Sequence, residues 1–265
     1  MIAGPPRKPV QVPLAVRKIA GGIPRPVWEN ELGGLTFAVG ADSPSRYIKW
    51  APVGSGIDLA AEAERLRWAA AHSPVPEVLG EGSDAAGAWL ILSPIPGENA
   101  VSDRWKADPE TAVRAIGRGL RALHDALPVA ECPFGWQAAD RLADARRRAA
   151  AGMIDPARWH RQHQHLDIAQ ALELLAEIPP LDRLVVCHGD ACAPNTLLDS
   201  KGEWCGHVDL GDLGLADRWA DLAVATWSTT WNYGQGWEEA LLAAYGTAPD
   251  EIRTTYYRLL WDLGP

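Results

Sequence analysis

The sequence predicts an α+β protein with two lobes, a small β-rich N-terminal lobe with one key helix and a larger, mostly helical C-terminal lobe. Strand-like segments concentrate before residue 93, and helical segments dominate after residue 98. Between them, Ser93-Pro94-Ile95-Pro96-Gly97 cannot continue a helix or a regular strand, because its prolines lack the N–H that both structures use. We therefore expect an N-terminal lobe over 1–93, a hinge over 94–98 and a C-terminal lobe over 99–265.

Residue patterns predict the elements of each lobe in order. Residues 58–71 are rich in Ala and free of Gly and Pro, which predicts the clearest helix. Short apolar or alternating runs predict the N-terminal strands, at 12–20, 35–39, 46–50, 77–79 and 88–92. The C-terminal lobe is expected to hold a β-rich insert over 184–209, a helix start over 213–218, and helices over 109–127, 140–151, 166–177, 218–230, 237–245 and 249–262.

Composition and charge narrow the functional classes. The chain has 47% hydrophobic and 22% charged residues, which is typical of a globular protein. Its formal net charge of −9 argues against nucleic acid as a partner and favours cationic ligands. Residues 199–265 hold 11 Asp and Glu against 4 Lys and Arg. They form either a solvated acidic surface or a wall for a polyamine-like substrate.

Cysteine usage and hydropathy predict a cytoplasmic protein. The four cysteines show no C-x-x-C spacing, so we expect reduced thiols rather than a zinc site or a disulfide framework. Residues 1–13 lack the apolar core of a signal peptide, and no run of 18 apolar residues is present. We expect neither a membrane contact nor an obligate protein partner.

The segment 184–212 carries the chemistry. Two apolar runs, 184–187 and 204–208, lead into polar residues that include Asp190, Asn195 and Asp209. Mg²⁺ prefers hard oxygen ligands and commonly uses one or two carboxylates together with phosphate oxygens. A further carboxylate near an attacking hydroxyl can orient it and accept its proton. The segment therefore predicts a magnesium–phosphate site.

The spacing of these residues matches the catalytic set of protein kinases. His188-Gly189-Asp190 and Asn195 reproduce H-x-D-x-x-x-x-N, and Asp209-Leu210-Gly211 reproduces the later D-x-G. An isolated H-x-D is usually an ordinary polar turn. The order of the full set and its flanking strands favour a kinase-like site.

The blocks HGDACAPN and VDLGDLGLADRWADLAVAT resemble the signatures of the aminoglycoside 3′-phosphotransferases, antibiotic kinases of the protein-kinase-like superfamily. The similarity extends weakly over nearly the whole chain. It implies that 1–93 form the nucleotide-binding lobe and 99–265 the catalytic and substrate-binding lobe. It implies that ATP and Mg²⁺ are used, with GTP as an open alternative to ATP. It also implies that Asp190 is the catalytic base and that Asn195 and Asp209 are metal ligands. His188 and Asp221 then support the catalytic loop, Asp221 by hydrogen bonding.

A kinase-like site also needs a strand lysine on the α- and β-phosphates, held by a helix glutamate. Lys49 is the one lysine in a strand-like context before the hinge, and Glu62 lies 13 residues later on the predicted helix. Glu64 is the alternative partner, and a solvated Lys49 is the alternative reading. Tyr47 shares the strand face of Lys49. The resemblance implies that its ring stacks on adenine, and the alternative is an ordinary core or surface tyrosine.

The resemblance places further nucleotide contacts on the backbone. The carbonyl of Ser93 and the N–H of Ile95 are expected to bind the adenine edge, although a rigid linker would look the same. The phosphate-covering loop lies near Gly33 and Gly34 but has no G-x-G-x-x-G, so Asn30 or the glycine backbone is expected to substitute.

The acceptor side departs from the family. Asp262 matches a family carboxylate that binds substrate amines. Asp212 stands where the family usually has Arg, and it either repels phosphate or extends a wall for a cationic substrate. Residues 157–165 are basic and His-rich where the family is acidic. We expect a solvated, partly titrating surface there rather than a metal site.

These observations predict an ATP- and Mg²⁺-dependent O-phosphotransferase that modifies a hydroxyl of an aminoglycoside antibiotic, a small cationic molecule. One alternative is a kinase of another small alcohol, which the basic 157–165 segment supports. The other alternative is a non-catalytic nucleotide-binding module. The complete set of Lys49, Asp190, Asn195 and Asp209 argues against that module.

Overall fold

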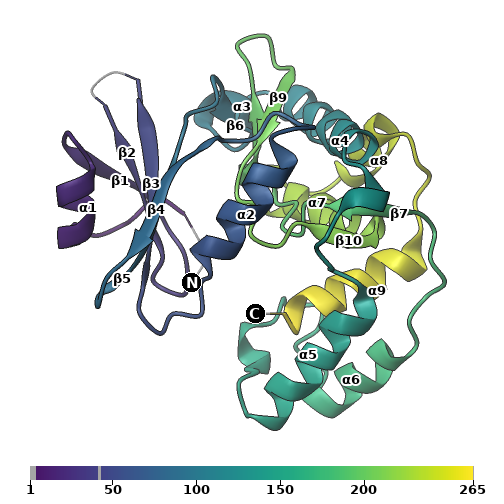
Figure 1. Ribbon diagram of the computed structural model, residues 1–265. Helices are drawn as coiled ribbons and strands as arrows, with labels where there is room; N and C mark the ends of the chain where they lie inside the picture. The colour runs from purple at the N-terminus through teal and green to yellow at the C-terminus, as the bar shows by residue number, and fades with distance from the viewer. Residues whose placement is uncertain (1–3, 41–42, 265) are drawn as a thin grey trace. The chain divides into compact units, whose positions relative to one another are not determined.

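The computed structural model describes residues 4–40 and 43–264. The chain divides after Pro96 into two compact units, each with its own hydrophobic core. The division lies within the 94–98 segment expected to be a hinge. The first unit is built on a β-sheet and the second is mostly helical, which confirms the predicted α+β class (Figure 1).

The first unit is an antiparallel sheet in the order β1-β2-β3-β5-β4, with two helices. Phe37 and Ile48 sit opposite each other on β2 and β3 and are fully buried. Helix α2 contacts β3, β4 and β5. The elements are α1 (Leu14–Ile19), β1 (Pro24–Glu29), β2 (Leu35–Val39), β3 (Arg46–Pro52), α2 (Leu59–Ala69), β4 (Val78–Ser83) and β5 (Gly87–Leu92).

The strand predicted over 12–20 is wrong, because this segment forms helix α1. Val16 and Ala20 are buried, and their four-residue separation puts them on one face of a helix. The sequence reading also missed strand β1, which contains two prolines. It lies at the edge of the sheet, where a missing N–H need not break a ladder bond.

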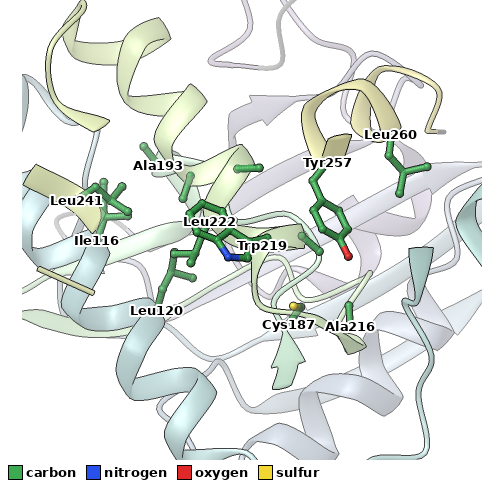
Figure 2. Packing of buried hydrophobic residues seen from close by; sticks show 14 of the residues in the cluster. Ile116, Leu120, Cys187, Ala193, Ala216, Trp219, Leu222, Leu241, Tyr257 and Leu260 are labelled. Atoms are coloured by element: carbon green, nitrogen blue, oxygen red, sulfur yellow. The ribbon is translucent and has the colours of Figure 1, made fainter. Parts of the chain in front are cut away.

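The second unit surrounds helix α4 with helices and short strands. Its elements are β6 (Glu98–Asn99), α3 (Asp103–Lys106), α4 (Pro109–Ala126), α5 (Ala138–Ala150), α6 (Ile168–Ala176), β7 (Leu184–Cys187), β8 (Thr196–Leu198), β9 (Trp204–His207), β10 (Gly214–Asp217), α7 (Trp219–Tyr233), α8 (Glu238–Tyr245) and α9 (Glu251–Asp262), with short 3₁₀ turns over 129–131, 156–158 and 193–195. Figure 2 shows the Trp219 ring amid its core, with Ile116, Leu120 and Leu222 nearby.

The predicted helix start over 213–218 is also wrong, because 214–217 form strand β10. This strand pairs antiparallel with β7, with Gly214 opposite Cys187. Helix α7 begins only at Trp219. The pairing has a consequence for chemistry. It sets the residues that follow Cys187 beside those that precede Gly214, which are the His188–Asp190 and Asp209–Asp212 motifs.

All four cysteines are free thiols, and Cys132 and Cys187 are buried. In the described part of the chain, no helix combines the length and the apolar character needed to cross a lipid bilayer.

Candidate active site

The predicted catalytic loop, which carries His188 to Asn195, leaves β7 and passes very close to the Asp209–Asp212 motif. Gly189 has φ +88°, and a Cβ at this position would lie 2.2 Å from the carbonyl oxygen of Asp212. A side chain at residue 189 is therefore excluded both by conformation and by space. Glycine thus allows the backbone of Asp212 to pack directly against the residue before Asp190.

Asp221, at the start of α7, holds the catalytic loop by its backbone. Its two oxygens accept hydrogen bonds from the N–H groups of His188 (2.6 Å) and Gly189 (3.0 Å). His124 Nε2 lies 2.9 Å from Asp221 Oδ2, and the other ring nitrogen of His124 contacts Tyr245. Burial raises the pKa of Asp221, but the hydrogen bonds and charges of His124 and His188 outweigh it, so the pKa is lowered.

Asp190 presents an unpaired carboxylate oxygen. Its Oδ2 accepts a hydrogen bond from Asn195 Nδ2 at 3.0 Å. Its Oδ1 is closed off from solvent and has no hydrogen-bond partner among the described residues. Burial, followed by the charge of Asp209, raises the pKa of Asp190, against weaker lowering effects that include hydrogen bonds to the side chains of Cys192 and Asn195. Buried acceptors are normally satisfied, so an open one indicates a position that a ligand fills.

Asn195 and Asp209 offer oxygen atoms next to this carboxylate. The Asn195 amide nitrogen donates to the carbonyl and the carboxylate of Asp190, which leaves the amide oxygen outside these bonds. Asp209 has φ +67°, and it is the one non-glycine residue with positive φ in the described ranges. Such strain, on the order of 1 kcal/mol, persists where the surroundings enforce it, commonly at functional sites.

In the first unit, Lys49 and Glu62 form an ion pair. Lys49 Nζ lies 2.6 Å from Glu62 Oε1, and the Glu62 side chain is buried. Glu64, the alternative partner, is exposed. Lys49 sits on the central strand β3, and Glu62 on α2. The pair holds a lysine ammonium at a defined place on the sheet.

The other predicted nucleotide contacts lie near the end of this unit. Tyr47 on β3 is partly buried and sits opposite Leu92, and burial raises its pKa. The Ser93 N–H and hydroxyl are both bonded to the backbone of Glu77. Among the described residues, the Ser93 carbonyl and the Ile95 N–H have no hydrogen-bond partner. These two backbone groups are therefore open to a ligand.

In the turn between β1 and β2, hydrogen bonds form within the turn itself. Asn30 Oδ1 accepts hydrogen bonds from the N–H groups of Leu32 (3.1 Å) and Gly34 (2.7 Å). The Gly33 N–H donates to the carbonyl of Asn30. The donors that we expected Gly33 and Gly34 to offer a phosphate are thus used within the turn, and Asn30 shapes it.

Most of the 157–165 segment is exposed, as its sequence predicts, but His163 and Trp159 are buried. His163 is buried, and its Nδ1 lies 2.6 Å from Asp262 Oδ2. The N–H of His160 donates to the same oxygen at 3.1 Å. The reason is the position of α9, whose last residue anchors the segment from about 100 residues away along the chain. Asp262, a predicted substrate contact, therefore already has one oxygen engaged.

Aromatic rings adjoin this anchor, and the sequence reading missed them. The His160 ring packs on Trp227 at 4.4 Å, and Trp227 on Trp231 at 5.1 Å between centroids. Trp231 remains 43% exposed. Both tryptophans flank Ser228 on α7, whose Oγ accepts the Ala193 N–H of the catalytic loop. The high tryptophan content was visible in the sequence, but this grouping was not.

Comparison with known proteins agrees with this geometry. Residues 29–255 match the model of the phosphotransferase enzyme family. The chain is 37% identical over 230 residues to the aminoglycoside 3′-phosphotransferase of Streptomyces fradiae, covering 82% of this chain and 85% of that protein. It is 36% identical over 253 residues to the streptomycin 3″-kinase of Streptomyces griseus, covering 87% and 88%.

A solved structure shares the fold at a similar identity. The aminoglycoside phosphotransferase APH(3″)-Id of Streptomyces rimosus superposes with a TM-score of 0.79 at 30% identity, covering 94% of this chain and 96% of that one. The same enzyme is also known in complex with ADP and streptomycin, where the TM-score is 0.75. The family match spans most of the sequence and includes the motifs described above. This chain therefore belongs to the phosphotransferase enzyme family.

Proposed function

We propose that the chain is an ATP-dependent phosphotransferase that transfers the γ-phosphate to a hydroxyl of an aminoglycoside. The observation that carries this proposal is the open Oδ1 of Asp190 on a loop that Asp221 holds in place. Two further facts support it. The chain is similar to an aminoglycoside 3′-phosphotransferase and a streptomycin 3″-kinase, and a structural relative binds ADP and streptomycin.

Asp190 acts on the acceptor. Its Oδ1 accepts a hydrogen bond from the substrate hydroxyl and orients the oxygen toward the γ-phosphorus. A bond forms between that oxygen and phosphorus, the bond from phosphorus to the β–γ bridging oxygen breaks, and ADP leaves. The hydroxyl proton passes to the Asp190 carboxylate. The raised pKa of Asp190 makes the carboxylate a better proton acceptor than an exposed one.

Lys49 acts on the nucleotide. Its ammonium, held by Glu62, binds the α- and β-phosphates and offsets charge that develops on the leaving group. The open Ser93 carbonyl and Ile95 N–H suit the donor and acceptor on the adenine edge. Tyr47 contributes an aromatic face. Gly33 and Gly34 contribute through the shape of the turn, because their N–H groups are engaged.

The donor set beside Asp190 fits Mg²⁺. A carboxylate from Asp209 and an amide oxygen from Asn195 are hard oxygen ligands, and the pKa of Asp190 is raised by burial and then by the charge of Asp209. When bound, Mg²⁺ neutralises charge on the β- and γ-phosphates. The role of Asn195 and Asp209 would then be to hold the Mg²⁺ ion beside those phosphates.

A second candidate, a kinase of a different small alcohol, is favoured by one observation. One Asp262 oxygen is engaged by His160 and His163, and exposed Arg158 and Arg161 lie in the same segment. A substrate-binding surface with these residues is less suited to a polycationic substrate than an acidic surface would be.

A coupled nucleotide-release assay across a panel of aminoglycosides, streptomycin included, and other hydroxylated antibiotics separates the two candidates. Aminoglycoside-dependent ADP release supports the first. Release with other hydroxylated antibiotics alone supports the second.

A further inference from the structure

A small pocket of the second unit holds the guanidinium of Arg141, which has no ion-pair partner among residues 4–40 and 43–264. The pocket has a volume of about 200 Å³, and Trp136, Asp140, Arg141, Asp144 and Leu260 are among its lining residues. It lies where the N-terminal part of α5 meets the end of α9. No predicted role falls on any of these side chains.

Within the described ranges, the Arg141 guanidinium makes no hydrogen bond or ion pair, and its Nη1 is closed off from solvent. The Trp136 ring lies 4.6 Å from the guanidinium carbon, and the charge of Asp212 is also nearby. Burial lowers the pKa of Arg141, in opposition to that charge. The side chain as a whole is partly buried. Guanidinium N–H groups that are closed off from solvent are usually paired, so this Nη1 can donate to an acceptor that the described residues do not supply.

Trp136 provides a second unsatisfied donor in the same pocket. Its indole Nε1 is buried and has no hydrogen-bond partner among the described residues. The residue is held firmly, because its N–H donates to the Leu215 carbonyl and the Leu215 N–H donates to Phe134. A Cβ at Gly214 would lie 2.9 Å from the Gly135 carbonyl carbon. This wall is therefore fixed to β10, directly after the Asp209–Asp212 motif.

The rim of the pocket carries an unpaired carboxylate. Asp140 makes no hydrogen bond or ion pair within the described part of the chain, whereas Asp144 is paired with Arg147. The pocket thus offers two N–H donors inside and one anionic acceptor at its edge. A ligand that matches it presents oxygen acceptors inward and a cation outward.

We propose that this pocket binds one hydroxylated, amino-substituted ring of the acceptor. Arg141 and Trp136 donate to its hydroxyl oxygens, and Asp140 accepts from an ammonium group. The inference rests on the proposed function and names a specificity site for it. A pocket of about 200 Å³ is smaller than the roughly 300–1,000 Å³ of sites for drug-sized ligands, so it suits one ring and not a whole antibiotic.

The test uses Trp136→Phe, which keeps the ring and removes one donor, and Arg141→Lys, which keeps the charge and removes the planar fork. The matched control is Trp105→Phe. Trp105 on α3 has an equally buried, unpartnered Nε1 and does not line this pocket. Acceptor KM, ATP KM and melting temperature are measured with the aminoglycoside that the wild type phosphorylates best.

We expect Trp136→Phe to raise the acceptor KM about three- to tenfold, and Arg141→Lys at least as much, with ATP KM within twofold. Trp105→Phe should leave all three quantities unchanged. Analogues that lack one hydroxyl should lose less affinity for Trp136→Phe than for the wild type.

Two outcomes would contradict different claims. If the wild type turns over aminoglycosides and neither variant changes the acceptor KM, the pocket is not a substrate site and the proposed function stands. If no aminoglycoside is turned over, the proposed function itself is wrong. If the Arg141→Lys variant folds poorly, the acceptor KM of Trp136→Phe alone decides whether the pocket is a substrate site.

Discussion

Asp209 combines a left-handed backbone conformation with a carboxylate that is predicted to bind a metal ion. Its φ of +67° is accessible to Asp and Asn at modest cost, because their short polar side chains tolerate this region. The conformation turns the chain sharply after β9 and Val208. An Asp209→Asn substitution therefore changes the charge of the ligand while keeping the turn.

We predict that Asp209→Asn lowers kcat and raises the Mg²⁺ concentration needed for half-maximal activity at least tenfold. A neutral amide is a weaker ligand for a hard divalent cation than a carboxylate. The measurement is a Mg²⁺ titration of phosphoryl transfer, with melting temperature as the folding control. An unchanged Mg²⁺ requirement in a folded variant means that Asp209 is not a ligand.

At the scale of elements, the start of α7 supports the catalytic loop through one buried carboxylate. The lowered pKa of Asp221 has a defined consequence for stability. A carboxylate with a folded pKa below its unfolded value stabilises the protein fully above the unfolded pKa, near 3.8. That contribution is lost as the pH falls through the lower folded pKa.

We predict that Asp221→Asn costs about 3 kcal/mol of unfolding free energy at pH 7, because it breaks a buried pair with His124 and places an amide NH₂ against N–H groups. The difference from the wild type should narrow only as the pH falls below about 3.8. Denaturant unfolding at several pH values measures it. A difference that is constant down to pH 3 would contradict the assignment of the stabilisation to the charge of Asp221.

The carboxylate of Asp262, at the end of α9, joins this helix to His163 of the 157–165 segment. We predict that Asp262→Ala and His163→Ala each destabilise the protein by about 1–3 kcal/mol, since each removes the charged or ring partner of a largely buried side chain, while Asp262 keeps the His160 N–H and His163 keeps Gln162. The double variant should cost less than the sum of the two. Exposed His165 provides the control, as His165→Ala should change stability by less than about 0.5 kcal/mol. Additive effects would mean that the pair is not coupled.

Elements with a strong period were predictable from the sequence, and those with a mixed signal were not. Helix α4 was predicted within one residue at its C-terminal end, because its apolar stripe is long and a proline marks its first turn. The short 12–20 and 213–218 segments were misread. Each segment is too short for the spacing of its apolar residues to distinguish a helix from a strand. Tertiary contacts decide the structure, through packing on Phe37 for the first segment and pairing with β7 for the second.

At the scale of the whole molecule, two units with separate cores carry different parts of the predicted set. The pair of Lys49 and Glu62 belongs to the first unit, and Asp190, Asn195 and Asp209 belong to the second. Local motifs with fixed spacing made these residues predictable from the sequence. Arg141 and the His163–Asp262 contact were not predictable. Arg141 is one of several arginines on a helix, and the other contact spans 99 residues.

The central claim is that Asp190 directs the γ-phosphate of ATP onto an aminoglycoside hydroxyl. The most direct measurement compares wild type and Asp190→Ala in aminoglycoside-dependent ADP release, with mass analysis of the antibiotic and calorimetric titration of ATP. We predict a phosphorylated antibiotic for the wild type. For the variant we predict a kcat lower by about 10²–10⁴-fold with ATP affinity nearly unchanged, because the carboxylate acts on the acceptor. A variant that keeps more than about a tenth of the wild-type kcat, or a wild type that modifies no aminoglycoside, would contradict this account.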